Sequence, residues 1–113
     1  MTNILLFRDP LAMQLAESGG KGANLARLTQ ASFPVPPGFI LRAQAFREFI
    51  SRAPDPFSRL SQLSTSDPAA LASEASALRA DLAKLPLPSS LESEVRTALS
   101  DFSPAQSFSV RSS

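Results

Sequence analysis

The residues best suited to chemistry in this chain of 113 residues are one lysine and three glycines, Gly19-Gly20-Lys21-Gly22. Backbone N–H groups of a glycine-rich turn can converge on an anion, and the N-terminus of a following helix adds partial positive charge. Lys21 would bring a full charge to the same place. The pattern therefore suits a phosphate or a carboxylate, and the alternative is a plain turn with a solvated lysine, which short motifs of this kind more often are.

The glycine-lysine turn differs from the two best-known phosphate-binding loops. In a Walker A loop, G-x-x-x-x-G-K-[ST], Leu15 would stand where the first glycine belongs and Gly22 where the magnesium-binding Ser or Thr belongs. The G-x-G-x-x-G pattern fails as well, because "GGKGAN" lacks its third glycine. A small P-loop protein is thereby excluded.

A second cation, Arg111, stands near the other end of the chain in "SFSVRSS". Phe108 and Val110 alternate there with polar residues, which is the period of a strand. An arginine delivered by a strand presents a planar fork of donors that matches phosphate oxygens. The alternative is a frayed end with a solvated arginine, and no local feature indicates that Lys21 and Arg111 meet.

Composition limits the chemistry further. The chain has no Cys and no His, which removes disulfides, thiol nucleophiles and the commonest acid–base catalyst, so we assign no catalytic and no metal-ligating residue. A net charge of +1 argues against nucleic-acid binding. The chain contains neither an apolar run of about 18 residues nor a signal-peptide pattern, and we expect a cytoplasmic protein that binds no membrane.

The first half of the chain predicts two strands and two helices. Residues 3–7 and 38–42 read as strands, and the prolines of "FPVPPGF" separate the second strand from what precedes it. A helix should begin at Gly22 and place one face of apolar residues inward, namely Ala23, Leu25, Ala26, Leu28 and Phe33. The i, i+3, i+4 spacing of Phe46, Phe49 and Ile50 predicts a short helix over 43–50.

The second half predicts two more helices and a final strand. A Pro-, Ser- and Asp-rich stretch, 51–68, is the segment that we expect to be mobile, and its last two residues, Asp67-Pro68, should start a helix. The apolar residues that keep helical spacing along this helix are Leu71, Ala75, Leu78, Leu82 and Leu85. Ser89 and Glu92 have the spacing of a capping box for the next helix. With the strand around Arg111, the order indicates one helix-rich α+β domain with a small mixed sheet.

Taken in order, "GGKGANLARL", "FPVPPGFILRAQAFREFI" and "FSVRSS" resemble the N-terminal ATP-binding domain of the pyruvate phosphate dikinase and phosphoenolpyruvate synthase family. Rifampin phosphotransferases are similar. The resemblance covers essentially the whole chain and is strongest at its two ends. It implies that residues 1–113 are a partial domain, the first lobe of an ATP-grasp-like fold, with ATP lying between this lobe and a second one further along the chain.

The resemblance also implies roles for individual residues. Lys21 and Arg111 match the family's contacts to the ATP phosphates, and Gly19, Gly20 and Gly22 form the phosphate-binding turn. Carboxylates outside this chain would hold Mg²⁺. ATP would phosphorylate a histidine on a separate swivelling domain, which passes the phosphate to pyruvate, or to an antibiotic in the rifampin enzymes.

Departures from the family pattern leave other functions open. Arg42 and Ala43 stand where the family usually has a helix-capping Thr or Ser, and the chain ends inside the last motif. We therefore expect a fragment or truncated product of a longer enzyme, inactive by itself, whose full-length form commonly dimerises. The alternatives are the same lobe of a rifamycin phosphotransferase, or a stand-alone, non-catalytic interaction module whose Leu- and Ala-rich helices bind a partner.

Overall fold

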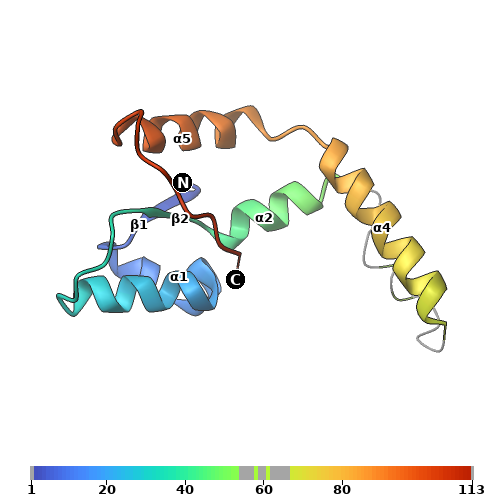
Figure 1. Cartoon of the computed structure of the whole chain (residues 1–113), viewed down its shortest axis with the longest axis horizontal. Coiled ribbons are helices and arrows are strands. Elements are labelled where there is room, and N and C mark those ends of the chain that lie inside the picture. Colours follow the sequence, from blue (N-terminus) through green and yellow to red (C-terminus); the bar gives the residue numbers. More distant parts are fainter. Residues whose placement is uncertain (1, 54–57, 59–60, 62–66, 113) are drawn as a thin grey trace. The chain divides into compact units, whose positions relative to one another are not determined.

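The computed structural model describes residues 2–53, 58, 61 and 67–112. They belong to two compact units, the first made of residues 1–46 and 88–113 and the second of residues 47–87 (Figure 1). The candidate site residues all fall in the first unit.

The described part of the first unit holds a sheet of two antiparallel strands, β1 (Ile4–Leu6) and β2 (Phe39–Leu41). Leu5 pairs with Ile40 at the centre, and both side chains are buried, whereas their neighbours Leu6 and Leu41 are exposed. This alternation is what a sheet with one covered face requires, because successive side chains point to opposite faces. Both predicted strands are confirmed.

A short 3₁₀ helix, η1 (Pro10–Met13), follows β1 and leads into α1 (Leu15–Gln30). Our prediction that this helix begins at Gly22 is wrong, because α1 runs through the glycines and contains a backbone break at Gly19. At its other end, Ser32 has a left-handed φ of 68°, which turns the chain away from the helix.

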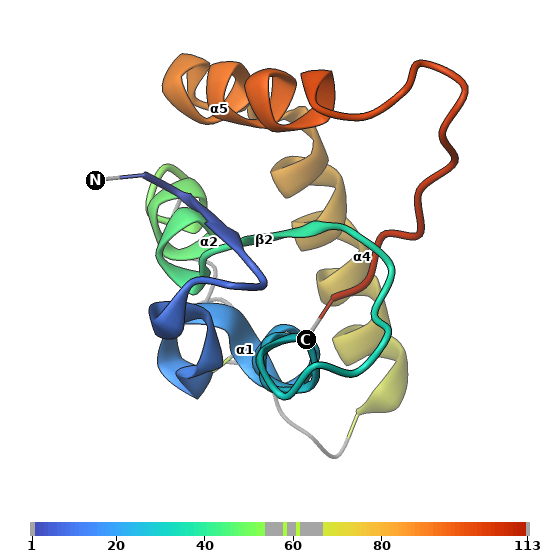
Figure 2. The same ribbon diagram turned by 90° about the vertical axis from the view of Figure 1, so that its left-hand side faces the viewer.

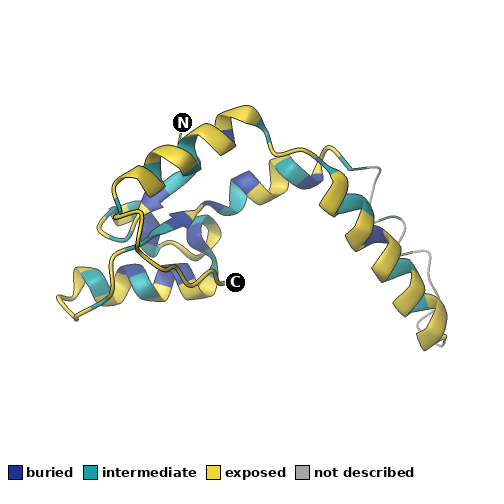
Figure 3. Ribbon diagram, turned by 45° about the horizontal axis from the view of Figure 1, so that its top comes forward, coloured by how far each residue is buried: buried dark blue, intermediate teal, exposed yellow. Residues whose placement is uncertain are grey.

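The inner face of α1 is made of small residues, so the predicted apolar face is only partly correct: Ala23 and Ala26 are buried, whereas Leu25 is half-buried. The buried residues of the helix are Ser18, Gly22, Ala23 and Ala26. Leu28 is exposed, and Phe33 is exposed and lies beyond the helix. In Figure 3 the buried positions gather on the strands and on one side of α1. Small side chains allow the helix to lie close to the sheet, so Ala26 joins the same core cluster as Leu5 and Ile40.

Helix α2 (Ala43–Ile50) has the predicted bounds. Ile50 is buried, but Phe46 is 62% exposed and Ala45 takes the inner position. The helical spacing therefore predicted the element correctly, although of the three spaced residues only Ile50 is buried and Phe49 is half-buried. Periodicity locates a helix more reliably than it ranks the residues on its inner face, since the neighbouring elements decide which of them is covered.

Helix α5 (Ser89–Ser100) belongs to the first unit. Its Glu94 contacts Asn3, the residue before β1. The Glu94 carboxylate accepts hydrogen bonds from the backbone N–H and from the side-chain amide of Asn3, both at 2.9 Å. The predicted capping box does not form: Pro88 is the residue that precedes the helix, and no side chain caps it. Ser89 is already helical, and Glu92 pairs with Arg96 at 2.9 Å instead.

The predicted last strand does not form either. Within the part of the chain that is described, residues 103–112 adopt no regular structure, and Val110 is 94% exposed. Phe108 packs edge-on against Phe102, with 5.0 Å between ring centroids, so the alternation reports a local contact and not a strand. A strand needs a neighbour to take its hydrogen bonds. The α+β class is confirmed, with two antiparallel strands where we expected a mixed sheet.

The second unit contains α4 (Pro68–Lys84), which begins as predicted. The Asp67 carboxylate accepts a hydrogen bond from the N–H of Ala70 at 3.2 Å, and Pro68 occupies the first helical position. Of the predicted stripe, Leu78 is buried, whereas Leu71, Ala75, Leu82 and Leu85 are half-buried. The stretch 51–68 that we expected to be mobile falls largely outside the described residues.

The hydrogen bonds between Glu94 and Asn3 lead to a prediction about stability. Glu94→Ala should lower the free energy of unfolding by about 1–3 kcal/mol, because it leaves two part-buried donors of Asn3 without their acceptor. Urea denaturation followed by circular dichroism measures this. Glu92→Ala on the same helix is the matched control, since its ion pair is solvent-exposed and should contribute less than about 0.5 kcal/mol. Equal losses of unfolding free energy in the two variants would show that the hydrogen bonds of Glu94 do not stabilise the fold.

Candidate functional site

The backbone break at Gly19 divides α1 into two helical segments. Gly19 has φ 71° and ψ 175°, a conformation that is essentially restricted to glycine. The chain is helical on both sides of it, so Gly20, Lys21 and Gly22 form the first turn of the second segment. A new helical start carries N–H groups without an intrahelical acceptor, and therefore partial positive charge. The glycine-lysine motif thus stands at a helix N-terminus inside a longer helix.

The three glycines differ in their surroundings. Gly20 and Lys21 are exposed, and a Cβ built on Gly20 would meet no atom within 4 Å. Gly22 is buried, and a Cβ there would lie 3.1 Å from the Cβ of Ser18 and 3.3 Å from Cδ1 of Ile40. Gly19 therefore permits the backbone break, and Gly22 permits the close packing of the helix against Ile40. Gly20 and Lys21 form the part of the turn that a ligand can reach.

Arg111 is exposed and lies in the irregular segment that ends the chain. Figures 1 and 2, two perpendicular views, both place the C-terminal end of the chain beside the N-terminal half of α1. The segment that carries Arg111 and the helix that carries Lys21 thus lie side by side, although they are far apart in the sequence. The tertiary structure brings the two segments together without the predicted strand.

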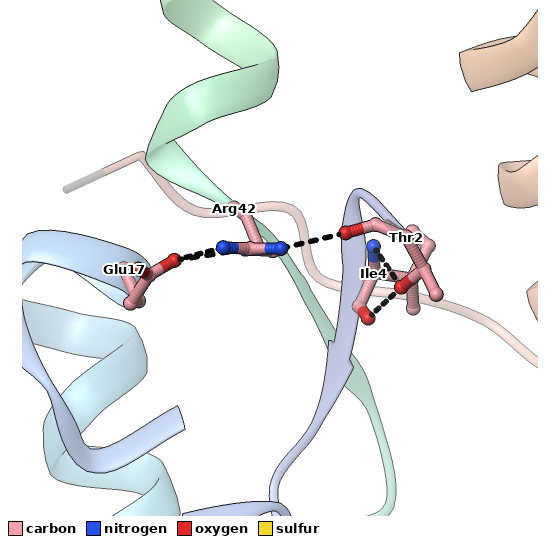
Figure 4. Close-up of polar contacts among 4 residues, drawn as sticks. All are labelled: Thr2, Ile4, Glu17 and Arg42. Atoms are coloured by element: carbon pink, nitrogen blue, oxygen red, sulfur yellow. Dashed lines mark hydrogen bonds and ion pairs between the residues drawn. The ribbon is translucent and has the colours of Figure 1, made fainter. Parts of the chain in front are cut away.

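The ion pair between Arg42 and Glu17, which lies two residues before Gly19, was not predicted from the sequence. The guanidinium of Arg42 donates to Oε2 of Glu17 from Nε at 2.8 Å and from Nη2 at 2.7 Å (Figure 4). Arg42 is only 5% exposed, and the Glu17 side chain is 24% exposed. The partners lie 25 residues apart, and no local pattern connects them. The position of Arg42, directly between a strand and a helix, is the sequence feature that could have indicated this pair. From the sequence we interpret it only as the absence of a capping Thr or Ser.

Arg42 joins four elements of the first unit. Its Nη1 donates to the carbonyl oxygen of Thr2 at 3.0 Å. Its backbone N–H donates to the carbonyl oxygen of Asn3, the residue before β1, at 2.8 Å. Its own carbonyl oxygen accepts from the N–H of Ala45 at 2.9 Å in the first turn of α2. Arg42 therefore ties the beginning of β1, the end of β2 and the beginning of α2 to Glu17 in α1.

The first unit also has a hollow that the glycine turn does not line. It has a volume of about 470 Å³ and is lined mainly by apolar residues, among them Phe7, Val35, Phe39 and Phe102. None of residues 15–24 lines it. Its polar lining residues are Arg8, Thr29 and Asp101, and none of them belongs to the glycine turn.

The described residues contain no group of three or more His, Cys, Asp or Glu side chains placed to hold a metal ion. No helix among them has the length and apolar character needed to cross a membrane.

Residues 15–113, from the first residue of α1 to the last residue of the chain, match the family model described as pyruvate phosphate dikinase, AMP/ATP-binding domain. The chain belongs to this family. The matched range of the AMP/ATP-binding domain contains the glycine turn, the Glu17–Arg42 pair and Arg111. Family membership was correctly predicted from the ordered motifs, whereas the individual nucleotide contacts of Lys21 and Arg111 stay predictions.

Curated relatives of the AMP/ATP-binding domain carry one name. A probable phosphoenolpyruvate synthase of Archaeoglobus fulgidus is 59% identical over 34 residues, which are 30% of this chain and 4% of the relative. One from Methanothermobacter thermautotrophicus is 56% identical over 34 residues, 30% of this chain and 5% of the relative. The phosphoenolpyruvate synthase of Aeropyrum pernix is 38% identical over 48 residues, 42% of this chain and 6% of the relative. The matches thus span only a small fraction of these relatives' length.

The break at Gly19 leads to a second prediction. Gly19→Ala should lower the free energy of unfolding by about 1–3 kcal/mol, because alanine is strained at this φ and ψ. Gly20→Ala is the matched control: the position has open space and no positive φ, so alanine should be neutral or stabilise by up to about 1 kcal/mol. Urea denaturation of both variants checks the difference, and equal stabilities would show that the break is absent in solution.

Proposed function

We propose that this AMP/ATP-binding domain is the nucleotide-binding lobe of a longer ATP-dependent phosphotransferase of the phosphoenolpyruvate synthase type. In that enzyme ATP phosphorylates a histidine on a separate domain, and the phosphate then passes to pyruvate. The observation that carries the proposal is the family match, which includes the exposed Gly20-Lys21 turn at a new helical start. The names of the curated relatives favour pyruvate over a rifamycin as the acceptor.

Lys21 and Arg111 would bind the ATP phosphates from two sides. The helical start after Gly19 offers N–H groups and partial positive charge, and Lys21 adds a full charge. Arg111 adds a fork of donors from the neighbouring C-terminal segment. Neither residue moves a proton or forms a bond to phosphorus. Their contribution is to orient the triphosphate and to offset its charge, which is most of what a protein supplies in phosphoryl transfer.

The chemistry of these donors suits ATP better than the metal that accompanies it. Cationic side chains and backbone N–H groups bind phosphate oxygens, whereas Mg²⁺ prefers carboxylate, phosphate and water oxygens. The carboxylate next to the turn in the sequence, that of Glu17, is already paired with Arg42. We therefore place the Mg²⁺ ligands outside this chain. When bound, Mg²⁺ would offset part of the charge on the phosphates.

Exposed apolar side chains support a further lobe and argue against a self-sufficient module. Leu41 on β2 is 49% exposed, and Phe108 and Val110 in the C-terminal segment are 46% and 94% exposed. A second lobe of an ATP-grasp-like fold would cover such residues and would close the nucleotide between two surfaces. The lobe described above would then provide only one side of the cleft.

The two cations can be tested in the full-length enzyme. Lys21→Ala and Arg111→Ala should each lower ATP-dependent autophosphorylation about tenfold to a hundredfold, because a charge-assisted phosphate contact contributes about 1.5–3 kcal/mol. Transfer of label from γ-labelled ATP measures it. Arg96→Ala, which removes an exposed arginine paired with Glu92, is the control and should be neutral. Normal rates in both site variants would show that the phosphates bind elsewhere.

The isolated chain of 113 residues allows a complementary test. We expect it to bind Mg-ATP weakly or not at all and to transfer no phosphate, because catalysis needs electrostatic stabilisation from several directions. Isothermal titration of the chain with Mg-ATP checks this. Micromolar affinity would mean that one lobe is a complete nucleotide site, and the two-lobe proposal would be wrong.

A further inference from the structure

Glu17 creates an electrostatic difficulty for a phosphate site in the glycine turn. It lies in the first turn of α1, two residues ahead of Gly19, and its side chain is 24% exposed. An unpaired carboxylate in that place would repel an incoming phosphate and would compete with it for the ammonium group of Lys21. Charges within a few ångströms of each other at a protein surface interact strongly enough for this to matter.

Arg42 removes that difficulty by its geometry. Two of its donors converge on the same oxygen of Glu17, and the third holds the carbonyl oxygen of Thr2 (Figure 4). The guanidinium is almost completely buried, so solvent screens the pair much less than an ion pair on the surface. Arginine keeps its charge at any ordinary pH, and its planar fork suits this kind of fixed contact. Glu17 is thereby held in one direction and neutralised.

We propose that Arg42 is a positioning residue for the phosphate-binding turn. By pairing with Glu17 it keeps a negative charge from acting on the ligand, and it fixes the direction in which the first turn of α1 enters the break at Gly19. Arg42 does not touch the ligand itself. The inference rests on the proposed function, because it assigns a second layer of residues to the same site.

A purely structural role of Arg42 makes a different prediction. A residue that only supports the fold changes the fraction of folded protein, and the molecules that remain folded bind ATP normally. A residue that neutralises Glu17 changes the affinity of the folded protein itself. The affinity should then return when the charge on Glu17 is removed, even though the ion pair is still missing.

The experiment uses the full-length enzyme and Mg-ATP as the probe. Arg42→Met should raise the Kd for Mg-ATP about tenfold, the size of one uncompensated charge near the ligand, with little change in kcat at saturating ATP. The double variant Glu17→Gln/Arg42→Met should regain most of the affinity. Wild-type affinity in Arg42→Met, or a double variant as weak as the single one, overturns the proposal.

Three further variants keep the result interpretable. Leu91→Ala removes a buried side chain of α5 and should lower the melting temperature while leaving the Kd of the folded protein unchanged. Arg42→Lys keeps the charge that neutralises Glu17 and should leave the Kd within about threefold of the wild-type value. If Arg42→Met does not fold, a Kd raised about tenfold or more in folded Arg42→Lys overturns the proposal, because the neutralising charge is still present. If Lys21→Ala binds Mg-ATP weakly and Arg42→Met binds it normally, this inference is wrong and the proposed function stands. If both variants bind Mg-ATP normally, the proposed function is wrong as well.

Discussion

The close approach of α1 to the two-stranded sheet is the constraint on which the rest of the first unit depends. At Gly22 even a methyl group would come within 3.3 Å of Ile40, so the helix can occupy this position only with small residues on its inner face. The same contact sets the register between helix and strand. With Gly22 opposite Ile40, the residue two places further along the strand, Arg42, reaches Glu17 in the first turn of the helix. Packing and electrostatics are therefore two consequences of one geometry.

The break at Gly19 belongs to the same arrangement. The first turn of α1 is held by Glu17 and Arg42, and the later turns are held by contacts of Gly22 and Ala26 with the core. The residue between these two anchored parts takes a conformation that side chains disfavour, and it is a glycine. The result is a helical start exposed to solvent at Gly20 and Lys21, although the helix as a whole is fixed at both ends. A rigid support under an accessible turn is what a site for a charged ligand requires.

Local patterns predicted those elements whose signals lie within a few residues of each other. The strands around Leu5 and Ile40, the helix after Arg42 and the start at Asp67-Pro68 follow from alternation, helical period and a capping side chain, and the structure contains all of them. The failures have a common cause. Ser89 has the spacing of a cap but lies inside its helix, and the alternation around Phe108 reflects an aromatic contact, because a spacing alone does not reveal the partner of a side chain.

The sequence by itself determined the family, the α+β class and the identity of Lys21 and Arg111 as the cations to test, since ordered motifs and residue types need no coordinates. Only the tertiary structure decided that the glycines interrupt a helix, and that Arg42 neutralises Glu17 over a separation of 25 residues. It also brought the C-terminal segment beside α1. The physical reason is that periodicity and turn propensity act along the chain, whereas ion pairs and close packing act through space between segments that the sequence does not connect.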